Sequence, residues 1–203
     1  MVNRREASKN ETRKLILTAA RRLFAQKGLD DCTIRDIARE AGVSAASVVV
    51  HFRSKTALLE VALKRDIEKT LAKLLDSLPA GQGLLERLLH LAKGFFQLYD
   101  QNRHLYRALI RQTIFEPVGD TPGITNQSER YIQLMAGMIE AGKGRGLIRP
   151  EVDSLVAAGA IFSLYLGVLI MFFRQPEMTV DLATEVLAAM TDQYLKGITA
   201  NYH

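Results

Sequence analysis

Apolar residues recur every three or four positions along almost the whole chain, the spacing that places them on one face of an α-helix. No run of alternating β-branched residues is long enough to indicate a sheet. The apolar stripes predict helices over about 11–27, 33–41, 44–52, 55–77, 84–99, 102–113, 131–141, 155–173 and 181–196. Proline and glycine predict a loop over 116–123. The chain is therefore expected to be all-α.

The stretch from Thr33 to Phe52 predicts two short helices joined by a tight turn. Thr33, with Asp36 three residues later, has the pattern of a helix start. Gly42 supplies the backbone freedom that a sharp turn needs, and Ser44 can cap the second helix. Two short helices across a glycine turn form a helix-turn-helix, whose second helix enters the major groove of DNA.

Basic charge is concentrated around this motif. Residues 1–55 hold 12 Lys and Arg against 6 Asp and Glu, a net charge of +6, whereas 56–203 hold 15 against 16, a net charge of −1. A basic segment gains affinity for DNA phosphates by releasing counterions, although a charge run is often only a solvated face. Because charge and motif coincide, we favour a DNA-binding domain. Five basic side chains form either an arm that touches DNA or a solvated terminus: Arg4, Arg5, Lys9, Arg13 and Lys14.

The other reactive side chains do not indicate an enzyme. No Ser/His/Asp, Cys/His or paired-carboxylate arrangement stands at motif spacing. His51 has no cysteine or second histidine nearby at ligand spacing, so we expect no metal and no cofactor. Cys32, the single cysteine, cannot form an internal disulfide and fits a reducing cytoplasm, either as a small residue near a helix start or as a redox sensor. The charged N-terminal segment lacks the apolar core of a secretory signal, so we expect a cytoplasmic location.

Residues 155–173 contain no charged side chain. Their length alone meets the requirement for a membrane span, and Gly159, Ser163 and Gly167 repeat a small residue every fourth position. A helix buried in a soluble oligomer is the interpretation we favour, because the other helices look amphipathic and no aromatic belt or Lys/Arg bias flanks the segment. Together with the last helix it would form a four-helix interface between two subunits.

The segment from Thr12 to Leu59 resembles the TetR family of bacterial transcriptional regulators. Its family-like features are A-x-x-L-F-x-x-K-G, T-x-x-x-I-A-x-x-A-G-V-S and H-F-x-x-K-x-x-L-L. Residues 146–153, GLIRPEVD, resemble the family more weakly. The resemblance implies an all-α homodimer with a three-helix DNA-binding domain over 1–53. It also implies a six-helix domain over 54–203 that binds a small effector and dimerises.

The resemblance also implies a set of DNA-contacting residues. Thr33, His51 and Lys55 match positions that hold phosphate. Many relatives carry an aromatic residue, usually Tyr, at the position of Val49, so this recognition helix is unusually apolar. Its alanines and valines can meet only thymine methyl groups or fit DNA shape, which leaves Arg35 and Ser47 as the polar candidates for base edges. The full set is Thr33, Arg35, Ser44, Ala45, Ala46, Ser47, Val49, Val50, His51 and Lys55.

Scattered aromatic and basic residues in the second half are candidates for an effector pocket, although an aromatic stripe at helical spacing is usually core. Arg107 and Arg111 could meet an anionic ligand or lie on the surface. Such a lining implies a mostly hydrophobic effector, aromatic or acyl. The candidates are Phe96, Tyr99, Tyr106, Arg107, Arg111, Phe115, Tyr131, Met135, Phe162 and Tyr165.

The sequence thus predicts a ligand-responsive repressor that binds a palindromic operator as a homodimer through its last two helices. Two alternatives stay open: a membrane-anchored regulator that uses 155–173 as a span, and a DNA-binding protein without a ligand.

Overall fold

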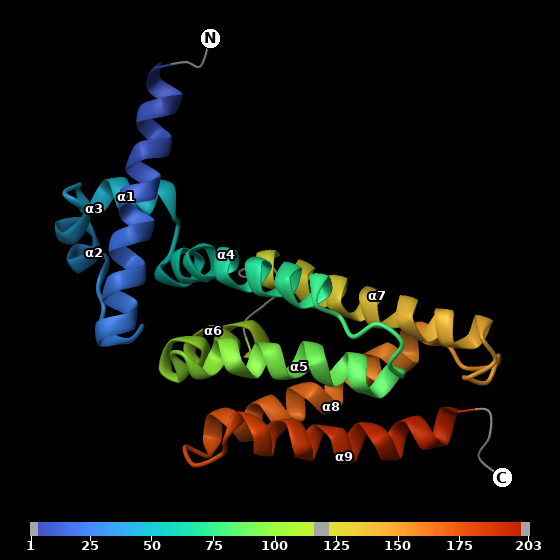
Figure 1. Cartoon of the computed structure of the whole chain (residues 1–203). Coiled ribbons are helices and arrows are strands. Elements are labelled where there is room, and N and C mark those ends of the chain that lie inside the picture. The colour runs from blue at the N-terminus through green and yellow to red at the C-terminus, as the bar shows by residue number, and fades with distance from the viewer. Residues whose placement is uncertain (1–3, 116–121, 200–203) are drawn as a thin grey trace. The chain divides into compact units, whose positions relative to one another are not determined.

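The computed structural model describes residues 4–115 and 122–199, and it leaves out the side chains of 4, 5, 113, 115 and 122–127 (Figure 1). The prediction of an all-α fold is confirmed. Within the described residues the chain forms nine helices: α1 Arg4–Lys27, α2 Ile34–Ala41, α3 Ala45–His51, α4 Lys55–Asp76, α5 Leu84–Asp100, α6 Arg103–Phe115, α7 Pro122–Gly144, α8 Ser154–Arg174 and α9 Val180–Ile198.

Two boundaries differ from the prediction. α1 begins at Arg4 rather than near residue 11, so Lys9 lies on a helix and not on an extended arm. The predicted loop over 116–123 falls mostly outside the described residues, and α7 already begins at Pro122. Proline is tolerated in the first turn of a helix, where its missing N–H has no intrahelical partner to lose.

The chain divides into two compact units. The first holds α1, α2, α3, α4 as far as Ile67, α6 and the start of α7; the second holds the rest of α4, α5, most of α7, α8 and α9. The unit that contains the helix-turn-helix therefore extends beyond residue 53. The boundary at 53/54 stays a prediction about where the DNA-binding segment ends.

The core of the first unit forms where α1 meets the helix-turn-helix. Ile16, Ala20 and Phe24 recur along one stripe of α1 and are buried. α1 contacts α2, and α2 in turn contacts α3, which contributes the fully buried Val48. A helix as short as α3 is marginal in isolation, so this packing is what keeps it formed.

α5 is at the centre of the second unit, and Figure 1 shows α8 and α9 running beside it. Leu88, Leu91, Phe95 and Phe96 on α5 are buried. Gly94 of the same helix lies directly against the side chain of Leu74 on α4, where any larger residue would clash. Close packing of this kind fixes the helices of the unit against one another.

Candidate functional site

The first helix of the motif, α2, begins with a complete capping box. The Thr33 hydroxyl oxygen accepts a hydrogen bond from the Asp36 N–H at 3.1 Å, and the Asp36 carboxylate accepts from the Thr33 N–H at 3.1 Å. The Thr33 hydroxyl also donates to that carboxylate at 2.7 Å. These hydrogen bonds from Thr33 hold the pKa of Asp36 below its ordinary value. The predicted start of the helix is confirmed.

The turn between the two motif helices has the geometry that its glycine allows. Gly42 adopts φ 67°, a left-handed conformation that costs other residues energy. The next residue, Val43, donates its N–H to the Ala38 carbonyl at 2.9 Å. Ser44 then caps α3, because its hydroxyl oxygen accepts the Ser47 N–H at 3.0 Å. The turn and both caps therefore hold α3 at a defined angle to α2.

The orientation of α3 exposes its apolar residues. Val48 is fully buried, as its helical position predicts, whereas the exposed fractions of Val49 and Val50 are 51% and 79%. Ala46 is also exposed, and Ala45 and Ser47 are partly covered. The structure thus presents Ala46, Val49 and Val50 on one accessible apolar face of α3.

The cations around this face differ in whether they have partners. Arg35 on α2 is exposed and makes no hydrogen bond or ion pair within the described residues. By contrast, Arg39 pairs with Asp36 at 2.6 Å and Arg22 of α1 pairs with Glu40 at 2.7 Å. Arg35 is therefore available for a ligand, as a base-reading residue must be.

Two predicted phosphate contacts also hold the structure together. Lys55 Nζ donates to the Leu29 carbonyl at 2.5 Å and to the Asp30 carbonyl at 3.4 Å, which ties the start of α4 to the loop after α1. The His51 carbonyl accepts from Arg13 at 3.3 Å. Removing the Lys55 side chain would therefore affect folding as well as any contact with DNA.

Two more basic residues lie at this surface: Arg13, which the sequence placed in a candidate basic arm, and Arg53, which the sequence analysis missed. The Arg13 guanidinium lies 4.4 Å from the centre of the Phe52 ring, which joins α1 to the end of the recognition helix. Arg53, directly after that helix, is exposed and has no partner in the described part of the chain. The position of Arg53 in the sequence, directly after the recognition helix, could have identified it as a candidate DNA contact.

Five of the predicted effector residues do come close together in the second unit, in a cluster of aromatic rings. Tyr131 of α7 lies edge-on to Phe95 with ring centres 5.0 Å apart. Tyr165 of α8 lies 5.5 Å from Phe96 and 6.1 Å from Phe162. Tyr99 completes the set, with its ring 5.9 Å from that of Phe95.

Three tyrosine hydroxyls meet inside this cluster. Tyr165 donates a hydrogen bond to Tyr99, whose pKa burial raises to about 12. Burial also raises the pKa of Tyr165 and Tyr131, so all three hydroxyls stay protonated near neutral pH. The Tyr131 hydroxyl is buried and has no hydrogen-bond partner within the described residues. An unpaired hydroxyl in an apolar core is costly, and a ligand that pairs it recovers that cost.

Other predicted effector residues lie elsewhere. Arg111 pairs with Asp30 at 3.3 Å and Tyr106 interacts with Arg21 of α1, so both contact parts of the first unit. Arg107 is exposed, and Met135 is buried in the second unit. Phe115 has a side chain outside the described residues.

The remaining candidate chemistry is limited. Among the described residues, no group of three His, Cys, Asp or Glu side chains could hold a metal ion. Cys32 is buried, and burial raises the pKa of its thiol, which leaves little thiolate for redox chemistry.

A helix-turn-helix with an accessible second helix, set in an all-α chain, defines a DNA-binding transcriptional regulator. The sequence profile of the bacterial regulatory proteins of the tetR family matches residues 16–62. This match and the relatives described next support a TetR-family regulator.

Relatives extend the similarity along the chain. It is 26% identical to the HTH-type transcriptional repressor KstR2 of Mycobacterium tuberculosis over 147 residues, which cover 71% of this chain and 72% of the relative. A transcriptional regulator from Saccharomonospora viridis, solved in complex with choline, has TM-score 0.68 and 24% identity, with 95% and 100% of the two chains covered. AibR, solved with isovaleryl coenzyme A and operator DNA, has TM-score 0.59 and 19% identity, with 88% and 97% covered. The last two likenesses establish the fold.

Proposed function

We propose that this protein is a cytoplasmic, ligand-responsive repressor that binds a palindromic operator as a homodimer. The observation that carries the proposal is the exposure of α3. Capped at Ser44 and anchored by the buried Val48, it presents Val49 and Val50 to solvent. The apolar surface of these exposed valines is removed from water only when a binding partner covers it. The major groove of DNA is the partner into which the second helix of a helix-turn-helix fits.

Base selection on this surface would combine two kinds of contact. The valines and Ala46 can contact thymine methyl groups, and Arg35 can donate to guanine. The resemblance also assigns phosphate contacts to Thr33, His51 and Lys55. Ser44, Ala45 and Ser47 are the remaining proposed contacts.

Binding titrations on two DNAs test the base-reading role of Arg35. An operator selected in vitro from a random library is compared with unrelated DNA, each at two salt concentrations. Arg35→Ala should weaken operator binding by roughly 5–150-fold, the equivalent of about 1–3 kcal/mol, and weaken binding to unrelated DNA much less. Arg39→Ala is the matched control, because Arg39 lies on the same helix but pairs with Asp36. Equal losses on both DNAs from Arg35→Ala would contradict the role.

The proposed dimer interface uses α8 and α9. Although α8 has the composition of a core helix, only 33% of its most apolar window is buried within the chain. Val156, Ile170 and Met171 on α8 and Leu182 and Met190 on α9 are exposed. Several exposed apolar side chains on two neighbouring helices of a soluble chain are typical of an interface between subunits.

The same composition keeps the membrane alternative open to test. By length and composition, α8 is the one helix among the described residues that could cross a membrane. Sedimentation of the protein without detergent separates the two interpretations. A soluble dimer supports the interface, whereas aggregation that detergent reverses would favour the membrane anchor.

The proposed effector site is the aromatic cluster, with the Tyr131 hydroxyl as its polar contact. The lining favours a mostly apolar molecule that carries one hydrogen-bond acceptor. Known ligands of similar folds, choline and isovaleryl coenzyme A, also combine apolar and polar groups. The remaining predicted lining residues, Phe96, Phe162 and Met135, would supply apolar contact.

The chain connection between α5 and α6 provides a route from effector to DNA. α5 carries Phe95, Phe96 and Tyr99 of the cluster, and only two residues separate it from α6. His104 of α6 lies against Gly28 at the end of α1, and Arg111 pairs with Asp30 just beyond it. An effector that moves the end of α5 would therefore move α6 and, through it, α1. Such a ligand shifts the population towards dimers whose two α3 helices no longer fit successive grooves.

A further inference from the structure

A cavity lies in the second unit, at residues other than those of the aromatic cluster. It has a volume of about 880 Å³, is partly open, and is lined by the loop between α4 and α5, the first turn of α5, the turn after α7 and the end of α9. Its apolar walls include Leu78, Leu84, Leu147, Ile148 and Leu195. This size lies within the range of pockets that bind organic ligands.

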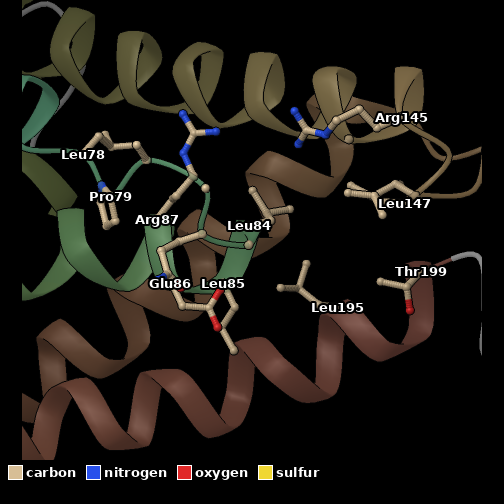
Figure 2. A pocket seen from close by; sticks show the side chains of 16 residues that line it. Leu78, Pro79, Leu84, Leu85, Glu86, Arg87, Arg145, Leu147, Leu195 and Thr199 are labelled. Atoms are coloured by element: carbon tan, nitrogen blue, oxygen red, sulfur yellow. The ribbon is translucent and has the colours of Figure 1, made fainter.

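Two arginine side chains line this cavity. In Figure 2 the side chains of Arg87, from α5, and Arg145, from the turn after α7, both lie on the side of the cavity that faces α7. The Nε atom of Arg87 is buried and has no hydrogen-bond partner within the described residues. Two like charges in one partly enclosed space repel each other, and a buried, unpaired donor of a charged group is costly.

Among the described residues, no carboxylate in the cavity wall pairs with either arginine. Glu86 is the one acidic residue among the described lining residues, and its side chain points away from the arginines, towards α9 (Figure 2). It lies instead over the backbone at Gly83, where an added Cβ would come within 2.7 Å of its Oε2 atom. An anion placed between Arg87 and Arg145 would satisfy both.

Backbone hydrogen bonds fix the rim that carries Arg145. The N–H of Gly146 donates to the Lys143 carbonyl at 2.9 Å, and the N–H of Leu147 donates to the Gly142 carbonyl at 3.0 Å. Arg149 attaches the same turn to the end of α9, donating to the Gly197 carbonyl at 2.6 Å. The backbone of the turn that carries Arg145 is therefore held in place, which preorganises this rim of the cavity.

We propose that this cavity is a second ligand site that binds an organic anion with an apolar body, a carboxylate joined to an aliphatic chain. Arg87 and Arg145 hold the carboxylate, and the leucine-rich wall holds the chain. The site is separate from the proposed effector site, because Arg87 and Phe95 are eight residues apart on α5, on the order of 12 Å along the helix.

The test uses the full-length protein and octanoate as the probe, with calorimetric titration and thermal melting as readouts. At ten times its Kd, octanoate should raise the unfolding midpoint by roughly 3–6 °C. Octylamine, with the opposite charge, and inorganic phosphate, without a chain, should bind at least ~10-fold more weakly, because each lacks one of the two contacts.

Variants assign the binding to these residues. Arg87→Met keeps the apolar stem and should weaken octanoate binding at least ~10-fold; the exposed Arg145→Glu should do the same without affecting folding. Arg130→Met is the matched control, because Arg130 is exposed on α7 and does not line the cavity. Melting without the probe checks that each variant folds.

Three outcomes would overturn the assignment: no octanoate binding, equal binding of octylamine, or unchanged affinity in Arg145→Glu. Tyr131→Phe separates this site from the effector site. If Tyr131→Phe abolishes octanoate binding and Arg145→Glu does not, the second site is wrong while the effector proposal stands. If Arg145→Glu abolishes octanoate binding and Tyr131→Phe does not, the second site is supported, independently of the identity of the effector.

Discussion

Replacing Gly167 on α8 by alanine should have opposite effects on the subunit and on the dimer. Gly167 is exposed, and a Cβ atom at this position would meet no atom within 4 Å in the isolated chain. Alanine removes the entropic cost of glycine in a helix interior, so the free energy of unfolding of the subunit should rise by roughly 0.5–1 kcal/mol.

The dimer should weaken because Gly159, Ser163 and Gly167 form a row of small residues on the exposed side of α8. Such a row allows a partner helix to approach closely. A twofold interface contains each residue twice. An extra methyl group in a well-packed contact costs about 1–3 kcal/mol, so two copies cost about 2–6 kcal/mol and raise the dimer Kd roughly 30-fold or more.

Sedimentation velocity over a dilution series measures the dimer Kd, and chemical denaturation at concentrations that keep the chain monomeric measures the subunit. Gly137→Ala is the matched control: Gly137 is exposed on α7, and an added Cβ there also meets no atom within 4 Å. It should raise subunit stability and leave the dimer Kd unchanged. If Gly167→Ala dimerises as tightly as the wild type, α8 does not form the interface through this row.

Three further predictions concern single interactions. Tyr131→Phe removes an unpaired buried hydroxyl, so the free energy of unfolding should be unchanged or higher. The effector concentration needed to release the protein from DNA should rise by roughly 3–10-fold. An unchanged effector concentration in DNA titrations would exclude Tyr131 from the site. Because the pKa of Asp36 is lowered, the ionised carboxylate stabilises the fold fully above its ordinary pKa of 3.8, and this stabilisation is lost as the pH falls below that value. The melting midpoint should therefore fall less between about pH 5 and about pH 3 in Asp36→Asn than in the wild type. Parallel curves of melting midpoint against pH for the two proteins would contradict this. Arg21 and Asp66 form a partly exposed ion pair, and a double-mutant cycle in denaturant should give about 0.5–1 kcal/mol of coupling, with a value near zero as the contrary result.

The sequence by itself determined the helices and the local geometry of the DNA-binding motif. Capping depends on residues three positions apart, as in Thr33 and Asp36, and the turn depends on the conformational freedom of Gly42. The helical period also separated Val48, which is buried, from Val49 and Val50, which are exposed. All of these are short-range properties, so they can be predicted without the tertiary fold.

Only the tertiary structure decided which distant groups meet. In the structure Lys55 donates a hydrogen bond to the Leu29 carbonyl and Arg111 forms an ion pair with Asp30. Nothing in the sequence indicates these partners for Lys55 or Arg111. The tertiary structure also brings Arg87, from α5, and Arg145, from the turn after α7, to the lining of one cavity. Helical periodicity gives the face on which a side chain lies, but the neighbour of that face depends on packing between segments far apart in the chain. For that reason the helix-turn-helix could be predicted in detail, whereas the ligand sites required the fold.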